Sequence, residues 1–131
     1  VPRSYLIESG KHANFMWLGF RRDVKELYSI SDVAVYPSYY REGGYPRGLT
    51  EPMAMSKPVI TTDSIHCSGT VEHGRNGFVV PIKDSTSLAG AIRQIACDDE
   101  LAKNFGQYSR MKAVNEFDET TIIRQVVQQI M

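Results

Sequence analysis

Cysteine is scarce in this sequence, which contains only Cys67 and Cys97 among its 131 residues. A single pair of cysteines does not make the disulfide framework of a small secreted domain, so we expect a reduced, cytoplasmic setting. Long apolar runs are absent as well, and none approaches the ~18 residues that a membrane-spanning helix needs. The first residues lack the charged and then apolar pattern of a signal peptide. Because the chain starts with Val1 and not with Met, we expect it to be a piece of a longer product.

An excess of charge of one sign is also missing. Fifteen Lys and Arg residues balance fifteen Asp and Glu residues, and no long basic run occurs. A nucleic-acid partner is therefore not expected. The length is close to the commonest size of one domain and is sufficient for a buried core. Since we find no internal repeat or boundary, residues 1–131 are expected to form a single domain.

Short apolar runs predict strands, and segments with a 3.6-residue apolar period predict helices. The expected strands are residues 14–18, 33–36, 59–62 and 77–81. The expected helices are residues 2–9 and 24–30, a short one starting near 47 or 48, one turn near 70, and a helical region 85–131 ending in a helix over 119–130. Asp23 and Glu26 resemble a capping box at the start of the second helix. The last helix is expected to bury apolar side chains in the core, or against another domain of a whole enzyme: Ile122, Ile123, Val126, Val127 and Ile130.

The order and composition of these elements indicate the fold class. Strands alternate with helices, and the runs at 33–36 and 59–60 are continuously apolar, whereas a half-exposed strand would alternate. Both features are typical of a parallel sheet that is covered by helices on both faces. The sequence therefore predicts an α/β fold with a doubly wound parallel sheet.

Residues 33–63 hold the strongest functional signal. An apolar strand is followed by a glycine-rich loop with Glu42, by a short helix with Glu51, and by a second strand. Open α/β sheets bind ligands at the carboxyl ends of their strands, and the unpaired N–H groups of a helix start attract phosphate. Carboxylates repel phosphate but bind hydroxyl groups, so a ligand with both phosphate and several hydroxyls fits best. Sugar nucleotides have that combination.

Plainer interpretations stay open for these and other residues. Taken alone, Glu42 and Glu51 are more often simple surface carboxylates. Arg21, Arg22 and Lys25 form a small basic patch that is usually just surface, although it also suits a peripheral contact with a membrane.

A metal site is not expected from this sequence. Possible metal ligands occur at His66, Cys67 and His73, but their spacing fits no usual zinc pattern and no fourth ligand is evident. Cys67 or Ser68 as a nucleophile lacks an ordered base partner in the sequence.

Several ordered runs resemble one family over nearly the whole chain. WLGFRRDVKELYSISDVAVYPSYYREGG, PRGLTEPMAMSKPVITTDS and TVEHGRNGFVVP are similar to the C-terminal nucleotide-sugar-binding domain of retaining GT-B glycosyltransferases. The resemblance is strongest to glycosyltransferase family 4 (group 1), in its bacterial polysaccharide and glycan-assembly branches. It implies a Rossmann-like domain that corresponds to the C-terminal half of a GT-B enzyme.

The resemblance also implies a role for each residue of the donor site. Two family glutamates frame that site, and they correspond to Glu42, the catalytic residue that binds the transferred sugar, and Glu51, which binds the ribose. Arg47 is expected to pair with the diphosphate from its place at the helix start. The groups implied to bind the sugar are Gly43, Gly44 and Tyr45. Those implied to bind the diphosphate are Gly48, Leu49 and Thr50, and those implied to bind the nucleobase are Phe20 and Arg21.

Three local features depart from the family pattern. Eight residues separate Glu42 from Glu51, where the family has seven. Pro52 follows Glu51 directly, so the helix is expected to be short, because proline beyond the first turn removes a hydrogen bond. Ser56 stands where the family usually has glycine, at a cost of ~1 kcal/mol if its backbone is left-handed.

A larger departure is the part of the family domain that has no counterpart here. The opening strand–helix–strand segment, which supplies an Arg and a Lys for the diphosphate, is not matched, and neither is the acceptor-binding N-terminal domain. In the strand order 3-2-1-4-5-6 of such sheets, residues 14–18 and 33–36 would be strands 3 and 4, which are not neighbours. The sheet is therefore expected to be incomplete on its N-terminal side, with an unpaired apolar edge at 33–36. Such an edge invites a dimer, a swapped assembly or a rearranged sheet.

The function implied by the resemblance is transfer of a sugar from a nucleoside-diphosphate sugar, with a UDP-sugar as the expected donor. The acceptor would be a glycan or a lipid-linked glycan bound through the missing N-terminal domain. The reaction would retain anomeric configuration and need no metal or other cofactor, and the fragment alone is expected to be inactive. Two alternatives remain, namely a non-catalytic nucleotide-sugar-binding or scaffold module and a nucleotide-sugar epimerase of the same fold.

Overall fold

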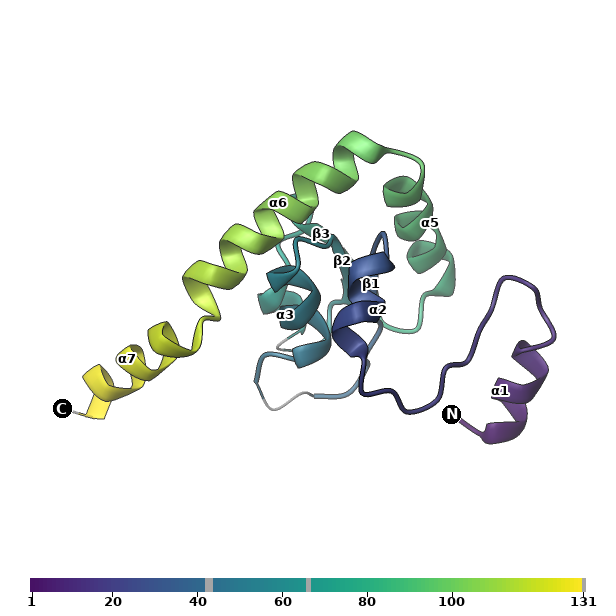
Figure 1. Cartoon of the computed structure of the whole chain (residues 1–131), viewed down its shortest axis with the longest axis horizontal. Helices are drawn as coiled ribbons and strands as arrows, with labels where there is room; N and C mark the ends of the chain where they lie inside the picture. The colour runs from purple at the N-terminus through teal and green to yellow at the C-terminus, as the bar shows by residue number, and fades with distance from the viewer. Residues whose placement is uncertain (42–43, 66, 131) are drawn as a thin grey trace.

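The computed structural model describes residues 1–41, 44–65 and 67–130. In chain order, the elements of this part of the chain are α1 (Arg3–Ser9), α2 (Val24–Ile30), β1 (Ala34–Tyr36), α3 (Arg47–Ala54), β2 (Val59–Thr62), α4 (Cys67–Thr70), β3 (Gly77–Val80), α5 (Ser85–Ala96), α6 (Asp99–Glu116) and α7 (Glu119–Ile130). The α1 helix and the segment after it lie to one side of the sheet, and α7 extends from the other side (Figure 1). No helix in these described ranges combines the length and the apolar character needed to cross a membrane.

The three strands form one parallel sheet in the order β1-β2-β3. Ala34 pairs with Val59, and Val59 pairs in turn with Gly77. All four residues of β2 are buried, as expected for the central strand of a parallel sheet that is covered on both faces. The predicted α/β fold with a parallel sheet is confirmed, and among the described strands β1 lies at an edge, as the incomplete sheet predicted. The dimer or swapped assembly expected from that edge stays a prediction.

Helices cover both faces of this sheet, and each face has its own apolar cluster. The first cluster joins the sheet to α2, α3, α4 and the C-terminal part of α6, and its buried members are Ala34, Leu49, Met53, Val59, Cys67, Val71 and Ala113. The second joins it to α5 and the start of α6, and its buried members are Ile60, Val80, Ala91, Ile95 and Phe105. Because successive strand residues point to opposite faces, neighbours such as Val59 and Ile60 enter different clusters. The long α6 helix therefore contributes to both layers (Figure 1).

Three expectations about local structure were wrong. Residues 14–18 form no strand, because a strand needs a hydrogen-bonded neighbour and no described strand lies beside them. Asp23 precedes α2 but does not form a capping box, since its carboxylate accepts hydrogen bonds from Arg21, with Nε at 2.7 Å. This contact lowers the pKa of Asp23 to about 2. No residue of α7 is buried, so the expectation that its apolar side chains join the core was wrong, while a contact with another domain of a whole enzyme stays a prediction.

The expectations for the short helix and the residue after it were confirmed. The helix begins at Arg47 and ends at Ala54, two residues beyond Pro52. Ser56 has a φ of 60°, a left-handed conformation that costs a residue other than glycine ~1 kcal/mol. Its amide donates to the Met53 carbonyl at 3.0 Å, which helps to end the helix.

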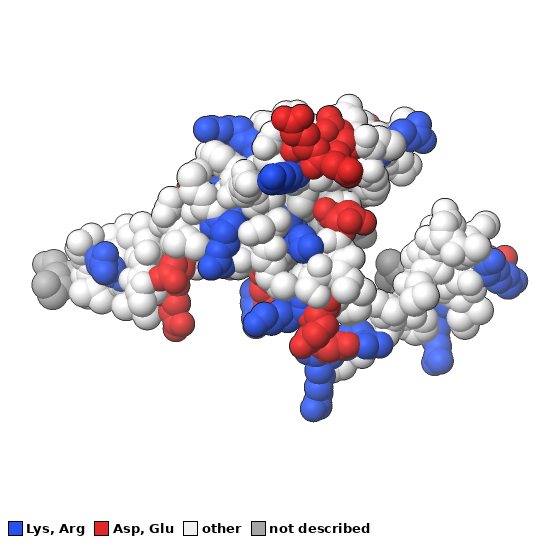
Figure 2. Space-filling view, turned by 45° about the horizontal axis from the view of Figure 1, so that its top comes forward, with Lys and Arg blue, Asp and Glu red and all other residues white. Residues whose placement is uncertain are grey.

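Acidic and basic side chains are interspersed over the face drawn in Figure 2. Blue and red groups there alternate over the surface and do not merge into a broad area of positive charge. This distribution agrees with the equal numbers of acidic and basic residues in the chain.

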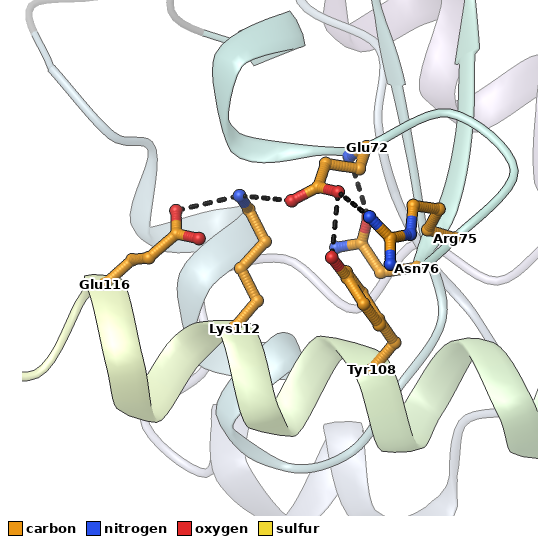
Figure 3. A network of polar contacts seen from close by, with 6 residues as sticks. All are labelled: Glu72, Arg75, Asn76, Tyr108, Lys112 and Glu116. Carbon is orange, nitrogen blue, oxygen red and sulfur yellow. Dashed lines mark hydrogen bonds and ion pairs between the residues drawn. The ribbon is translucent and has the colours of Figure 1, made fainter.

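A polar network ties α6 to the segment between α4 and β3 (Figure 3). The Lys112 ammonium lies 2.8 Å from Glu72 Oε1 and 2.8 Å from Glu116 Oε2. The Tyr108 hydroxyl donates to Glu72 Oε2 at 2.9 Å, and Arg75 adds an ion pair at 3.3 Å. Lys112 is buried, so its charge requires these partners. The network therefore fixes the position of α6 on the chain segment that leads into β3.

Hydrogen bonding sets the protonation of this network. The pKa of Glu72 is lowered by its hydrogen bonds from Lys112 and Tyr108. Burial lowers the pKa of Lys112, but hydrogen bonds to Glu116 and Glu72 outweigh burial and raise it above its ordinary value. Both groups are therefore charged at neutral pH.

Two helical glycines make a matched pair for testing the contact of α6 with the turn after α3. A Cβ at Gly106 in α6 would lie 2.2 Å from the Ser56 carbonyl oxygen, whereas a Cβ at Gly90 in α5 would meet nothing within 4 Å. We expect Gly106→Ala to lower the free energy of unfolding by about 1–3 kcal/mol, because α6 must move away from the backbone at Ser56. Gly90→Ala should raise it by up to about 1 kcal/mol, since alanine is the better helix former. Urea denaturation of both variants checks this, and equal effects of the two substitutions would contradict the close approach.

The charge of Glu72 should make the stability of the protein depend on pH. The folded-state pKa of Glu72 lies below its ordinary value of 4.5, so its contribution is present above that value and is lost as the pH falls through the folded pKa. We expect Glu72→Gln to lower the free energy of unfolding by about 1 kcal/mol at neutral pH. This difference from the unsubstituted protein should shrink as the pH falls below 4.5. Denaturant titrations over that pH range measure it, with Glu100→Gln on exposed surface as the control, and a difference that is independent of pH would refute this role.

Candidate functional site

The carboxyl ends of the strands lie along one edge of the sheet, and α3 starts there after the loop that follows β1. The carbonyl of Pro46, the residue before α3, accepts hydrogen bonds from Leu49 N at 2.9 Å and Thr50 N at 3.1 Å. No acceptor among the described residues pairs with the amides of Arg47 and Gly48. Of the three amides expected to bind the diphosphate, that of Gly48 thus remains open to a ligand, while those of Leu49 and Thr50 close the first helical turn.

Close packing at Gly48 holds the start of α3 against the end of β1. A Cβ at Gly48 would lie 2.7 Å from Cδ2 of the Tyr36 ring, so a larger residue would push the helix and the strand apart. Leu49, next in the chain, is fully buried in the first apolar cluster. Tyr36 borders the same apolar cluster that buries Leu49, so both residues hold the helix start against the sheet.

Arg47 and Glu51 form an ion pair on the outer face of α3. The Arg47 guanidinium reaches Glu51 Oε1 with Nε at 2.9 Å and with Nη2 at 2.7 Å. Residues four apart lie on the same side of a helix, which explains how a cation at the first position meets a carboxylate one turn later. The side chain of Arg47 is 88% exposed and that of Glu51 is 38% exposed.

A cavity of about 460 Å³ lies between α2 and α3, beside this ion pair. Its size falls within the range of small-molecule sites. Its lining combines three cationic side chains with one carboxylate and one phenol: Arg22, Val24, Lys25, Tyr28, Arg47, Glu51, Ala54 and Met55. The pKa of Tyr28 is raised by burial and by the nearby charge of Glu51.

A second hollow of about 320 Å³ lies on the α6 side of α3. Glu51 and Thr50 line it together with residues from the end of α6, among them Arg110 and Phe117. The Tyr45 ring packs against Phe117 with 4.7 Å between ring centroids. Glu51 therefore borders a hollow on each side of α3.

The structure brings some of the predicted site residues together and leaves others apart. Glu51, Arg47 and Gly48 meet at the start of α3, and Gly44, with a φ of 125°, lies in the loop before it. Phe20 is 89% exposed and Arg21 pairs with Asp23, so neither lines the cavity. The predicted Glu42 and Gly43 lie outside the described residues.

Sequence reasoning missed the contribution of α2 to the cavity. Arg22 and Lys25 were interpreted as a surface patch, and Tyr28 as part of an apolar helix face. The relevant signal was the spacing of Lys25 and Tyr28, since residues three apart share one side of a helix. It predicts a common face, but only the packing of α2 beside α3 shows what that face meets.

Two of the residues considered as metal ligands or nucleophiles, His73 and Cys67, have structural roles. His73 Nδ1 accepts the amide of Val79 at 3.0 Å, and the His73 ring packs against Phe78. Cys67 is fully buried in the first apolar cluster. Within the described part of the chain, no group of three or more His, Cys, Asp or Glu residues is arranged to hold a metal ion. His66 lies outside that part.

Comparison with known proteins supplies the family. The model of the family described as glycosyl transferases group 1 matches residues 4–112. EpsD of Bacillus subtilis is 34% identical over 113 residues, which cover 86% of this chain and 29% of EpsD. The N-acetyl-alpha-D-glucosaminyl L-malate synthase of Bacillus anthracis is 29% identical over 110 residues, which cover 84% of this chain and 28% of the synthase. The chain thus spans less than a third of the length of these curated relatives.

Solved structures share both the fold and part of the sequence. A crystal structure of HepE from Anabaena in complex with UDP superposes with a TM-score of 0.87 at 27% identity, and the match covers 97% of this chain and 35% of HepE. HepE in complex with UDP-glucose matches the same shares of the two chains with a TM-score of 0.85. The parallel sheet, the helices on both its faces and the match of the family model over most of the sequence lead to one conclusion: this chain belongs to the glycosyl transferases group 1 family, and its fold is the Rossmann-like fold of GT-B glycosyltransferases.

Proposed function

We propose that this chain is the donor-binding part of a glycosyltransferase that uses a nucleoside-diphosphate sugar. The observation that carries the proposal is the cavity beside the start of α3, which the Arg47–Glu51 ion pair lines, with the open amide of Gly48 next to Arg47 in the chain. A carboxylate suits the hydroxyls of a ribose, whereas a guanidinium and a helix start suit a diphosphate. Crystal structures of HepE hold UDP and UDP-glucose, which supports a UDP-sugar as the donor.

Each predicted contact has a place in this proposal. Glu51 binds the ribose, while Arg47 and the open amide of Gly48 bind the diphosphate. Leu49 and Thr50, whose amides bond to the Pro46 carbonyl, contribute through the dipole of the helix. Glu42 is assigned to the transferred sugar as the catalytic residue. Gly43, Gly44 and Tyr45 serve the sugar, and Phe20 and Arg21 the nucleobase.

The chemistry demands stabilisation of a leaving diphosphate. Cleavage of the anomeric C–O bond develops positive charge on the sugar and negative charge on the diphosphate, and fixed donors and dipoles stabilise the latter. The start of α3 supplies such a dipole, and Arg47 supplies a full positive charge. We propose that the reaction retains anomeric configuration and uses no metal, in a cytoplasmic enzyme whose acceptor is a glycan or a lipid-linked glycan.

Nucleotide-sugar binding without transfer is the second candidate for this chain. The cavity supports this candidate, because binding needs only the donor site, whereas transfer needs an acceptor site as well. Pairing of the exposed β1 edge with a second copy is proposed from the sheet order alone.

Titration of the chain with UDP and UDP-glucose tests the proposed site. We expect Glu51→Gln to weaken UDP binding about tenfold, because loss of one charged hydrogen bond costs about 1.4 kcal/mol or more. Calorimetry measures the dissociation constants, and Glu100→Gln, which removes a carboxylate from exposed surface on α6, should leave them unchanged. The proposed site is wrong if the unsubstituted chain binds neither ligand. It is also wrong if the Glu51→Gln variant and the unsubstituted chain bind UDP equally tightly.

A further inference from the structure

We infer that Arg47 is a positioning residue for Glu51, which it holds in the orientation that binds the ribose hydroxyls. This inference rests on the proposed nucleotide site and adds to it a link between the ribose contact and the diphosphate contact. It assigns Arg47 two simultaneous partners, with one edge of the guanidinium on the carboxylate and the remaining N–H groups free for phosphate oxygens.

The geometry of the ion pair supports simultaneous contacts of Arg47 with Glu51 and with phosphate oxygens. Arg47 Nε and Nη2 both converge on Oε1 of Glu51, at 2.9 and 2.7 Å. Oε2 of Glu51 has no hydrogen-bond partner in the described part of the chain, so it is available to a ligand hydroxyl. The guanidinium keeps further N–H donors in a fixed plane, and its contact with Glu51 leaves them free for phosphate oxygens.

Helix stability does not account for the order of the two residues. A cation in the first turn of a helix meets the positive end of the helix dipole, and Arg before Glu is the less favourable order for a pair four residues apart. Exposed pairs of this kind contribute little to helix stability even when well ordered. Arg47 therefore raises the positive potential at the helix start at little gain to the fold, which is useful for a site that binds an anion.

The groups around the ion pair are consistent with this role. From α2 and the residues before it, Arg22, Lys25 and Tyr28 face the cavity, and from the α6 side Arg110, Asp118 and Glu119 border the second hollow. The cations on the α2 side attract the carboxylate of Glu51 as well. Without a directional partner, Glu51 is free to turn toward either hollow, and Arg47 selects one orientation.

The orientation of Glu51 before the ligand binds should have a measurable effect on affinity. Ordering a free glutamate side chain costs conformational entropy, which the ligand must otherwise offset on binding. When Arg47 has already ordered Glu51, the ribose hydroxyls gain the full strength of their hydrogen bonds. Loss of Arg47 should therefore weaken recognition of the hydroxyls, whereas a residue that touches only the diphosphate would leave hydroxyl recognition unchanged.

The experiment compares dissociation constants of the full chain for UDP and for 2′,3′-dideoxy-UDP, which lacks both ribose hydroxyls. We expect the unsubstituted chain to bind UDP more tightly than the dideoxy ligand. The ratio of the two dissociation constants should fall about fivefold in Arg47→Gln and to a similar value in Glu51→Ala. The double variant should show little further loss, since both substitutions remove the same interaction. Arg47→Lys, which keeps the charge but not the planar donors, should lose most of the preference.

Arg22→Gln is the matched control, because it removes a positive charge from the same cavity without breaking the Arg47–Glu51 pair. It should weaken the binding of both ligands alike and leave the ratio of their dissociation constants unchanged.

If Arg47→Gln leaves this ratio unchanged while UDP binds more weakly, Arg47 acts on the diphosphate alone and the inference is overturned. If the unsubstituted chain binds UDP without preference over the dideoxy ligand, the positioning role is also overturned while nucleotide binding stands. If it does not bind UDP at all, the proposed function fails together with the inference. Circular dichroism and thermal unfolding of each variant separate these outcomes from misfolding.

Discussion

The burial of β2 between two strands and two layers of helices is the constraint on which the rest of the structure depends. All four of its residues are buried, and its alternate side chains enter the two apolar clusters. Because β2 is paired on both sides, it sets the positions of the ends of β1 and β3. The loop after β1 and the start of α3 are held at one edge of the sheet by these pairings, so the geometry of the candidate site depends on a buried strand that does not line the cavity.

Helix α6 couples the two helical layers to this sheet. Gly106 permits it to approach the backbone at Ser56, and Lys112 joins it to Glu72 ahead of β3. Its end also carries Phe117, against which Tyr45 from the loop before α3 packs. A single long helix thus supports the turn after α3 and the loop before it, which are the two segments that determine where Arg47 and Glu51 lie. The polar network shown in Figure 3 is therefore part of the support of the site, although none of its members lines the cavity.

The candidate site combines groups with opposite preferences. Glu51 is placed where three cations face it, and the open helix start adds further positive potential. A ligand with hydroxyls alone would leave these cations unused, and one with phosphate alone would meet a carboxylate. The proposed ligand carries both groups, so it suits the carboxylate as well as the cations.

Much of the fold was accessible from the sequence because it depends on local patterns. Short apolar runs predicted β1, β2 and β3, and the position of Pro52 predicted a short α3. The failures were at residues whose state depends on distant partners. Residues 14–18 have the composition of a strand but find no neighbouring strand, and Asp23 has the spacing of a capping box but binds Arg21 instead.

The sequence by itself determined the class of fold, the family and the identity of the acidic and basic residues at the start of α3, because periodicity and ordered motifs are properties of the chain. Only the tertiary structure decided that Arg47 pairs with Glu51, that α2 supplies Arg22 and Tyr28 to the same cavity, and that α7 stays outside the core. Those outcomes depend on which surfaces pack together. Packing is a relation between segments far apart in the chain, and no local pattern specifies it.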